Sequence, residues 1–292
     1  MPSLDDLKKR IKSVKSTQKI TKAMKMVAAA KLRKAQESAE KGRPYSQKMQ
    51  NIILNLTNSI NDPQNAPKLL VGNGNDKTYL CLVLTADRGL CGGFNSNICK
   101  LAKTNFKKLL NEGKELKIIT VGSKGLDQIK REYGKYIIKK FSFKDKKQIT
   151  FTEAEIIGNE IITLFNANEF DKCILFYNNF KNVITQIPQA QQIIPAEKKI
   201  VAEENKESIS YEFEPDEDEI LEDLLPKNIS TQVFKAFLEN AASEQGSRMT
   251  AMDNATRNAG DLVDELTINY NRSRQASITK ELIEIISGAE SL

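Results

Sequence analysis

The chain has 292 residues, of which 40% are apolar and 7% aromatic, and it contains neither His nor Trp. Without His there is no Ser-His or Cys-His nucleophile pair and no His metal ligand, and so few aromatics argue against a stacking surface for single-stranded nucleic acid. The formal charge of +6 is uneven: residues 1–60 hold 14 Lys or Arg against 4 Asp or Glu, whereas residues 200–226 hold 11 Asp or Glu and one Lys. Such blocks are either solvated faces or surfaces for two differently charged partners.

The four cysteines are Cys81, Cys91, Cys99 and Cys173. They form no C-x-x-C pair, so no zinc site is expected. No apolar signal run follows Met1, and no apolar stretch reaches the roughly 18 residues of a membrane span. We therefore expect a soluble protein without structural disulfides, which would meet a membrane only through partners.

Residues 1–60 are predicted to form one long helix. Ser3 followed by two acidic residues fits an N-cap with acids in the first turn. The apolar residues then follow the three-four spacing of a heptad seam, which is typical of a coiled coil. This seam begins with Leu4, Leu7, Ile11 and Val14.

Polar residues occupy the continuation of this seam. Gln18 and Thr21 keep its phase, so the apolar stripe is predicted to resume one face over. Gly42 and Pro44 are places where the helix could bend or stop. The predicted stripe consists of Ile20, Met24 and Val27, followed by Ala28, Leu32 and Ala35.

A linker rich in Asn, Pro and Gly is expected at residues 61–77, and residues 78–213 then alternate strand and helix patterns. The run TYLCLVL at residues 78–84 is typical of a strand buried on both faces. The alternation predicts a Rossmann-like α/β domain with a mostly parallel sheet. Predicted strands are 78–84, 116–121, 136–143, 172–177 and 183–187, with 210–213 as a candidate edge strand; predicted helices are 95–110, 124–133 and 152–165.

Residues 214–226 are predicted to be an acidic foot or linker, and residues 227–292 a second long helix. Two long helices with narrow apolar seams cannot bury those seams alone. We therefore expect them to pair as a long antiparallel coiled coil, with the α/β domain inserted between them. The predicted seam of the second helix includes Met252, Ala255, Ala259, Leu262 and Leu266, and continues to Ile278.

Residues 85–95 (TADRGLCGGFN) lie between a predicted strand and helix, where many α/β proteins bind phosphates. The segment lacks the G-x-G-x-x-G order and the Lys-Ser/Thr pair of a P-loop. We predict a structural turn or protein-contact loop carrying Asp87, Arg88, Gly89 and Cys91. A nucleotide- or thiol-dependent enzyme is one alternative, and a basic coiled-coil scaffold that binds nucleic acid non-specifically is another.

Three stretches carry a resemblance to a known family: KITKAMKMVAAAKLRKAQ at 19–36, the segment 85–95, and INYNRSRQASITKELIEIISG at 268–288. Together they resemble the gamma subunit of F-type ATP synthases, and the resemblance covers essentially the whole chain. It implies a central rotor shaft, one copy per complex, surrounded by three alpha and three beta subunits and bound to the epsilon subunit and the c-ring. Rotation of the c-ring would then drive the conformational cycling of the three catalytic beta subunits and so ATP synthesis or hydrolysis.

The resemblance also implies roles for particular residues, with no catalytic residue, cofactor, metal or nucleic acid expected. The contacts to alpha and beta subunits would be Met24, Lys25, Glu244, Arg248, Arg274, Gln275 and Thr279. An apolar bearing tail would consist of Ile278, Leu282, Ile285 and Ile286, although Leu282 fits a coiled-coil core position equally well. The foot near the epsilon subunit and c-ring would be Tyr211, Phe213 and Glu214.

Location and regulation follow from the same resemblance. We see no inserted cysteine-bearing loop of the kind that some photosynthetic members carry, so thiol regulation is not expected. The expected place is the cytoplasmic face of a bacterial inner membrane, with the matrix side of the mitochondrial inner membrane as the alternative.

Overall fold

The computed structural model describes residues 3–59, 67–146, 148–195 and 217–290. The chain forms two compact units. The coil unit comprises Met1–Ala30 and Arg248–Leu292, and the sheet unit comprises Lys31–Ser247. Two long helices, α1 (Leu4–Ser59) and α6 (Glu217–Glu290), each contribute one stretch to either unit.

A five-stranded sheet of order β3-β2-β1-β4-β5 is the centre of the sheet unit. Its first four strands are parallel, and β5 runs antiparallel to β4 at the edge. The prediction of a mostly parallel α/β sheet is thus confirmed. The strands are β1 (Thr78–Leu84), β2 (Glu115–Val121), β3 (Ile137–Phe141), β4 (Lys172–Phe180) and β5 (Gln186–Ile194).

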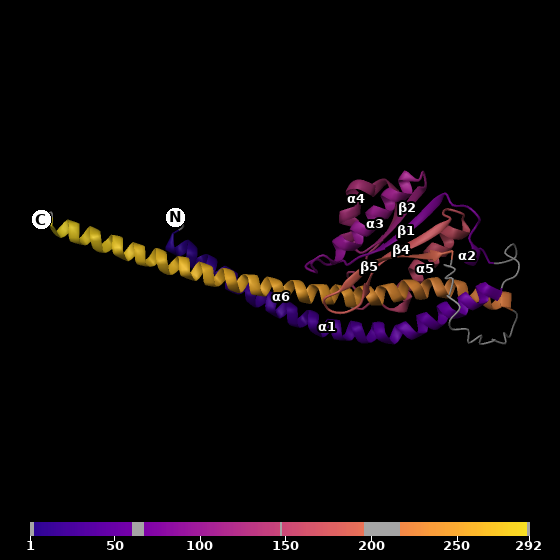
Figure 1. Ribbon diagram of the computed structural model, residues 1–292, viewed down its shortest axis with the longest axis horizontal. Helices are drawn as coiled ribbons and strands as arrows, with labels where there is room; N and C mark the ends of the chain where they lie inside the picture. Colours follow the sequence, from indigo (N-terminus) through magenta and orange to yellow (C-terminus); the bar gives the residue numbers. More distant parts are fainter. Residues whose placement is uncertain (1–2, 60–66, 147, 196–216, 291–292) are drawn as a thin grey trace. The chain divides into compact units, whose positions relative to one another are not determined.

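Helices cover both faces of this sheet (Figure 1). One face packs against α3 (Phe94–Asn111) and α4 (Ser123–Tyr133), and the other against α5 (Phe151–Asn166) and the sheet-unit stretch of α6. Strand β1 is apolar throughout because both of its faces are buried. Leu80, Leu82 and Leu84 lie in the core beside α5, and Cys81 and Val83 lie in the core beside α3. The short helix α2 (Lys68–Val71) and the 3-10 turn η1 (Gly134–Tyr136) complete the unit.

The edge strand β5 differs from its prediction. It begins at Gln186 and runs to Ile194, rather than covering 183–187. Its sequence QIPQAQQII is polar and contains Pro188, which is tolerated because an edge strand needs ladder hydrogen bonds on one side only. The candidate strand at 210–213 lies outside the described residues.

The N-terminal helix keeps a single heptad phase. Ile20 and Val27 are 58% and 56% exposed, so the predicted shift to their face is wrong. Thr21 is buried instead, whereas the predicted positions Ala28 and Leu32 are buried as expected. Pro44 lies inside the continuous helix. The heptad positions, all buried or half-buried, are Leu4, Leu7, Ile11, Val14, Gln18, Thr21, Lys25, Ala28, Leu32, Ala35, Ala39, Gly42, Ser46, Met49 and Ile53.

Helix α6 begins at Glu217 rather than at residue 227, with Pro226 inside it. Leu221 and Leu225, one turn apart, are buried in a small apolar cluster with Met49 and Leu70. Burial of this face stabilises a helical turn that the acidic composition and the proline did not predict.

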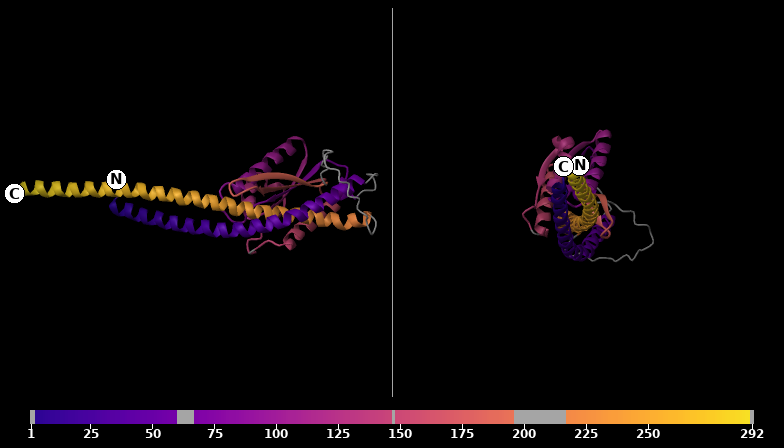
Figure 2. Two further views of the ribbon diagram at one scale, coloured as in Figure 1. Left: turned by 60° about the horizontal axis from the view of Figure 1, so that its bottom comes forward. Right: turned by 90° about the vertical axis from the view of Figure 1, so that its left-hand side faces the viewer.

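In the coil unit α1 and α6 run antiparallel, side by side (Figure 2). Thr256 Oγ1 donates a hydrogen bond to Thr21 Oγ1 at 2.8 Å, and Lys25 Nζ pairs with Asp253 Oδ1 at 2.6 Å. These contacts supply polar partners at the polar seam positions. On α6 the seam runs through Met252, Thr256, Ala259, Val263 and Leu266, so the predicted position Leu262 is wrong and is 43% exposed.

Candidate functional site

The carboxyl ends of β1 and β4 flank the point where the strand order reverses, which is where open α/β sheets usually bind ligands. Here the side chain of Asn240, on α6, fills this point. Its Nδ2 donates to Leu84 O at 3.0 Å, and its Oδ1 accepts from Asn178 N at 2.7 Å. The backbone groups that would meet a ligand are therefore bonded to the helix, which argues against the nucleotide-enzyme alternative.

The loop after β1 is held by the carboxylate of Asp87. It accepts hydrogen bonds from Ser123 N (2.8 Å), Ser142 Oγ (2.8 Å) and Phe143 N (3.0 Å). Asp87 therefore fastens together the segments that follow β1, β2 and β3. Arg88 and Gly89 form an exposed tip beyond it.

Cys91, in the same loop, is buried. Its sulfur accepts a hydrogen bond from Asn95 Nδ2 at 3.3 Å, and its carbonyl oxygen accepts from Ser247 Oγ of α6 at 2.7 Å. Reactive thiols are partly exposed. The geometry thus makes Cys91 part of the attachment of the loop to α6 and disfavours a thiol site.

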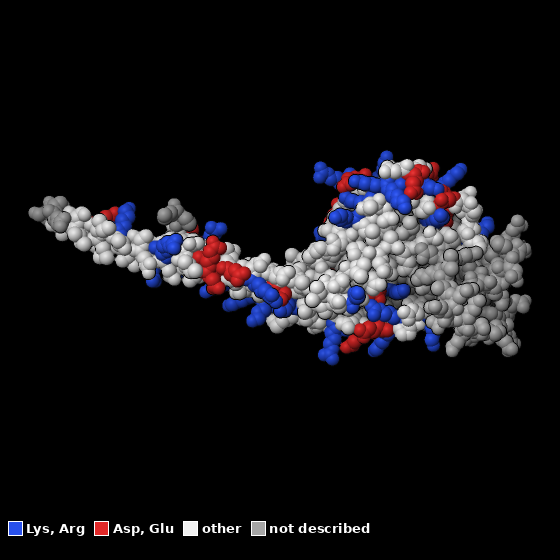
Figure 3. Space-filling view, in the orientation of Figure 1, with Lys and Arg blue, Asp and Glu red and all other residues white. Residues whose placement is uncertain are grey.

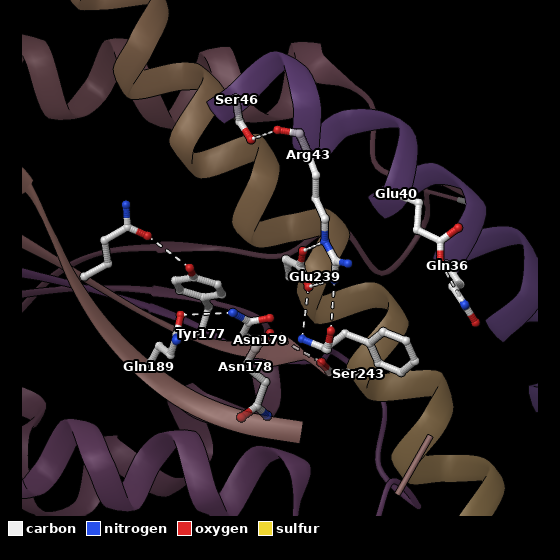
Figure 4. A network of polar contacts seen from close by, with 12 residues as sticks. Gln36, Glu40, Arg43, Ser46, Tyr177, Asn178, Asn179, Gln189, Glu239 and Ser243 are labelled. Carbon is white, nitrogen blue, oxygen red and sulfur yellow. Dashed lines mark hydrogen bonds and ion pairs between the residues drawn. The ribbon is translucent and has the colours of Figure 1, made fainter. Parts of the chain in front are cut away.

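An ion pair between a buried Glu239 and a partly exposed Arg43 joins both long helices to the sheet within the sheet unit (Figure 4). Arg43 of α1 donates to Glu239 of α6 through Nε (2.7 Å) and Nη2 (3.1 Å). The same residues hold the end of β4, because Arg43 Nη2 donates to Phe180 O (2.9 Å) and Phe180 N donates to Glu239 Oε2 (3.0 Å). We call this group the Arg43–Glu239 clasp. The hydrogen bonds that Arg43 donates to Glu239 raise the pKa of Arg43, so the guanidinium stays charged.

Small residues allow close packing beside the clasp. A Cβ on Gly42 of α1 would lie 2.8 Å from Leu238 Cδ1 of α6. A Cβ on Gly158 of α5 would collide with the hydroxyl of Ser230 of α6. Helices α1, α5 and α6 are thus packed so closely that larger side chains at these positions would separate them.

A polar cavity of about 470 Å³ lies between β5, α1 and α6 in the sheet unit. Its wall is mostly carboxamides in a hydrogen-bonded series: Tyr177 Oη donates to Gln191 Oε1 (3.0 Å), and Gln191 Nε2 donates to Gln232 Oε1 (3.1 Å). Burial raises the pKa of Tyr177 to about 12, so its hydroxyl remains a donor at neutral pH. These side chains use their hydrogen-bonding groups on one another, and they form no pair of an acid and a base that could transfer a proton.

The expected contacts near residue 25 lie in the coil unit. Met24 is half-buried. Lys25 is engaged with Asp253, which also binds Arg257 Nη2 at 2.8 Å. Hydrogen bonding from Lys25 lowers the pKa of Asp253. The coil unit presents side chains of both charges on its visible face (Figure 3).

The C-terminal part of α6 extends beyond the N-terminus of α1 (Figures 1 and 2). The contacts between Thr21 and Thr256 and between Lys25 and Asp253 set the antiparallel register, which places Leu4 opposite roughly residue 274 at the same rise per residue. Beyond that level α6 has no α1 residue beside it. The predicted contact and tail residues there are all exposed: Arg274, Gln275, Ile278, Thr279, Leu282, Ile285 and Ile286.

The apolar members of this end are exposed, at 49% for Ile278, 54% for Leu282 and 68% for Ile285. The alternative assignment of Leu282 to a coiled-coil core is therefore wrong within this chain. Glu244 and Arg248 are half-buried on α6. The predicted foot residues Tyr211, Phe213 and Glu214 lie outside the described residues.

Sequence reasoning missed Arg43, Glu239 and Asn240. The last two interrupt an apolar run at 233–242 (VFKAFLENAA), which was the available signal that they are buried and bonded. Arg43 stands between Gly42 and Pro44, two residues that the sequence marks as places for a bend or end of the helix, and nothing local indicates its partners. Within the described residues no group of acidic or cysteine side chains could hold a metal ion, and no helix is long and apolar enough to cross a membrane.

Solved structures first define the class of protein. The central stalk and c-ring structure of the Tetrahymena thermophila mitochondrial ATP synthase contains a chain that is 28% identical, with a TM-score of 0.60, over 81% of this chain and 99% of that one. A chain in a Euglena gracilis mitochondrial ATP synthase structure has the same fold, with a TM-score of 0.67 at 20% identity over 99% of this chain and 94% of that one. The fold is thus that of ATP synthase stalk proteins.

Sequence relatives then identify the family. A family model described as ATP synthase matches residues 3–292. The ATP synthase gamma chain of Pelagibacter ubique is 73% identical, and that of Sinorhizobium fredii 57% identical, each over the full length of both chains. The chain belongs to the ATP synthase gamma chain family.

Proposed function

We propose that the chain is the central rotor shaft of a proton-translocating ATP synthase. It would couple rotation of the c-ring to conformational cycling of three catalytic beta subunits, and so to ATP synthesis or hydrolysis, without catalysing a reaction itself. Family membership over the full length supports this proposal. So does Asn240, which occupies the ligand position of the sheet.

The exposed apolar end of α6 is the observation that carries the proposal. Apolar area left in water costs about 25 cal/mol per Å², so a run of exposed Ile and Leu residues favours burial in a partner. Apolar contact is non-directional, and a shaft end held in an apolar sleeve can therefore turn. This bearing tail consists of Ile278, Leu282, Ile285 and Ile286, which are all exposed.

The polar contacts would be weak enough to exchange during rotation. The ion pair of Lys25 with Asp253 is partly exposed, and such pairs contribute little. Lys25 could then leave Asp253 for a carboxylate of a passing subunit. The proposed contacts to alpha and beta subunits are Met24, Lys25, Glu244, Arg248, Arg274, Gln275 and Thr279, with the Asp87, Arg88, Gly89 and Cys91 loop as a further contact.

The proposed assembly has one copy of this chain, three alpha and three beta subunits, the epsilon subunit and the c-ring. The foot residues Tyr211, Phe213 and Glu214 would meet epsilon and the c-ring. We propose a peripheral position on the cytoplasmic face of the inner membrane, supported by the bacterial origin of the relatives. No cofactor or nucleic acid is part of the proposal.

Disulfide cross-linking tests the rotor role directly. A cysteine placed by Gln275→Cys is exposed, whereas the four native cysteines are buried and give a low background. In the complex purified with the tagged chain, oxidation with a second cysteine on a surrounding beta subunit should stop ATP hydrolysis, and reduction should restore it. Ile184→Cys, at an 85% exposed site of the sheet unit, is the control.

Two results would contradict the proposal. One is a tagged chain that purifies without any ATPase. The other is a complete cross-link at residue 275 that leaves ATP hydrolysis unchanged, because a shaft fixed to its ring cannot rotate.

A further inference from the structure

One stretch of the sheet unit is strongly basic. Residues 96–146 hold 14 Lys or Arg and 5 Asp or Glu, a balance of +9 that exceeds the +6 of the whole chain. Figure 3 shows Lys and Arg side chains gathered over α3 and α4, with fewer acidic ones among them. This charge lies in the globular unit, separate in sequence from the basic N-terminal helix.

A groove crosses this basic surface between α3 and α4. Its volume is about 450 Å³. Lys100, Lys103 and Lys107 of α3 form one wall, and Gln128 and Glu132 of α4 form the other. Two hydroxyl-bearing residues of α3 also line the groove, Ser96 and Thr104.

The lysines of the groove are unequally satisfied. Lys103 Nζ pairs with Glu132 Oε1 at 2.5 Å, which fixes Lys103 and neutralises the acid of the opposite wall. Lys100 and Lys107 are exposed and make no ion pair with a carboxylate in the described parts of the chain. The groove thus presents two available ammonium groups, one on either side of a fixed one.

We propose that the α3–α4 groove is a docking site for an acidic helix of a partner protein. The three lysines follow the i, i+3, i+7 spacing of one helix face and span about 10 Å along α3. Acidic side chains on a helix repeat with the same spacing, so a third helix lying along the groove can meet both available lysines at once. The side-chain amide of Gln128 can donate a hydrogen bond to a carboxylate that reaches its wall.

A small, charged groove fits a weak and salt-dependent complex. Charged rims mainly accelerate encounter and set orientation, whereas affinity requires buried anchors. The groove has one apolar element in its lining, the buried Cys99. The partner is therefore expected to be held at low ionic strength and released as salt rises.

The probe is a fluorescein-labelled, alanine-rich peptide of 15 residues with glutamates at i, i+4 and i+7 on one helix face. Binding to the full-length chain is measured by fluorescence anisotropy in low salt. Two exposed pairs changed from attraction to repulsion are worth roughly one factor of ten, so K100E/K107E should weaken binding about tenfold or more. Circular dichroism verifies that each variant is folded.

The control variant is K108E/K130E. Lys108 and Lys130 are exposed on the same two helices but do not line the groove, and the charge change is identical. Its binding should fall by less than about threefold, because only long-range screened charge is lost. A second control is a peptide of the same composition with its glutamates spread around the helix, which should bind more weakly than the one-face peptide.

Four results would overturn the proposal. Equal losses of affinity in the two double variants would mean that the peptide responds to the overall positive charge and not to the groove. Equal binding of the two peptides would mean that the spacing of the glutamates does not match that of the lysines. Displacement of the peptide by millimolar inorganic phosphate would indicate a small-anion site. Binding to phosphatidylglycerol vesicles that K100E/K107E abolishes, with peptide binding unchanged, would indicate a membrane surface.

Discussion

The two units of this chain reach stability in different ways. In the sheet unit the strands bury side chains on both faces, so that Leu80, Ile119 and Phe106 are fully excluded from water. In the coil unit the seam is one side chain wide and includes Thr21 and Thr256 as a hydrogen-bonded pair. The sheet unit thus has a core of its own, whereas the coil unit leaves several Ile and Leu side chains of α6 exposed. The contrast suits a shaft whose end must exchange contacts while its attachment stays fixed.

The largest expected effect separates the two cores. Phe106 is fully buried, with edge-on ring contacts to Tyr133 (5.2 Å) and Phe176 (5.9 Å). Phe106→Ala should reduce the free energy of unfolding of the sheet unit by about 3–5 kcal/mol. Val263→Ala, in the coil seam, should cost about 1 kcal/mol. Hydrogen exchange measures the free energy of unfolding of each unit. Similar losses in the two variants would contradict the difference between the two cores.

The next effect concerns the Arg43–Glu239 clasp. Glu239→Ala leaves the Arg43 guanidinium and Phe180 N, at the end of β4, without their acceptor. We expect a loss of about 2–4 kcal/mol, reduced from the fully buried value because Arg43 is about one-third exposed. Urea unfolding measures the change. The double variant R43M/E239L should recover part of this loss, since apolar pairs can replace buried ion pairs. If the free-energy loss of R43M/E239L equals the sum of the losses of R43M and E239L measured alone, the two residues act independently.

The third effect is a pH dependence that belongs to the sheet unit. Glu153 accepts hydrogen bonds from Thr150 at the start of α5 and pairs with Lys146, and the bonds from Thr150 are the main reason that its pKa falls to about 2. An acid with a depressed pKa stabilises the fold above its unfolded pKa of about 4.3, and that stability is lost as pH falls toward 2. Glu153→Gln should cost about 1–2 kcal/mol at pH 7 and flatten this acid limb. Urea midpoints between pH 7 and pH 3 measure the effect. If Glu153→Gln leaves the slope of stability against pH unchanged, Glu153 is not the source of this pH dependence.

The smallest effect concerns the ion pair of the coil unit. Lys25 and Asp253 are both partly exposed, so Lys25→Met should lower the melting temperature slightly in low salt and not measurably at about 1 M salt, where the screening length is about 3 Å. Asp253→Asn is the matched variant from the other helix. A loss that persists in high salt would mean that this pair is as important as the Arg43–Glu239 clasp.

Much of the fold could be predicted from the sequence because its signals are local. The TYLCLVL run and the alternation after it predicted the α/β sheet, and heptad spacing predicted both long helices. The phase error at Ile20 arose because Gln18 and Thr21 are polar, and a single helix does not reveal that Thr256 of the other helix satisfies Thr21. The early start of α6 was missed for a similar reason, since Leu221 and Leu225 are buried against residues from elsewhere in the chain.

The attachment residues could not be predicted because their role depends on contacts distant in sequence. Glu239 is an acid within an apolar run, but its partners Arg43 and Phe180 are 196 and 59 residues away. Asn240 likewise meets Leu84 across 156 residues. The resemblance indicated which residues of α6 form the tail. That they are exposed depends on the pairing of α1 with α6, which the sequence of α6 alone does not reveal.

The pairing of the two chain ends has a consequence for the order in which the protein can be made. Thr21 and Thr256 are 235 residues apart, so α1 cannot find its coil partner until almost the whole chain has been synthesised. At 5–20 residues per second this delay is about 10–50 s. Meanwhile the sheet unit, up to β5, can already collapse around its own strands. Nascent chains should therefore carry an unpaired basic helix for most of translation, which makes it the segment that a ribosome-associated chaperone would protect.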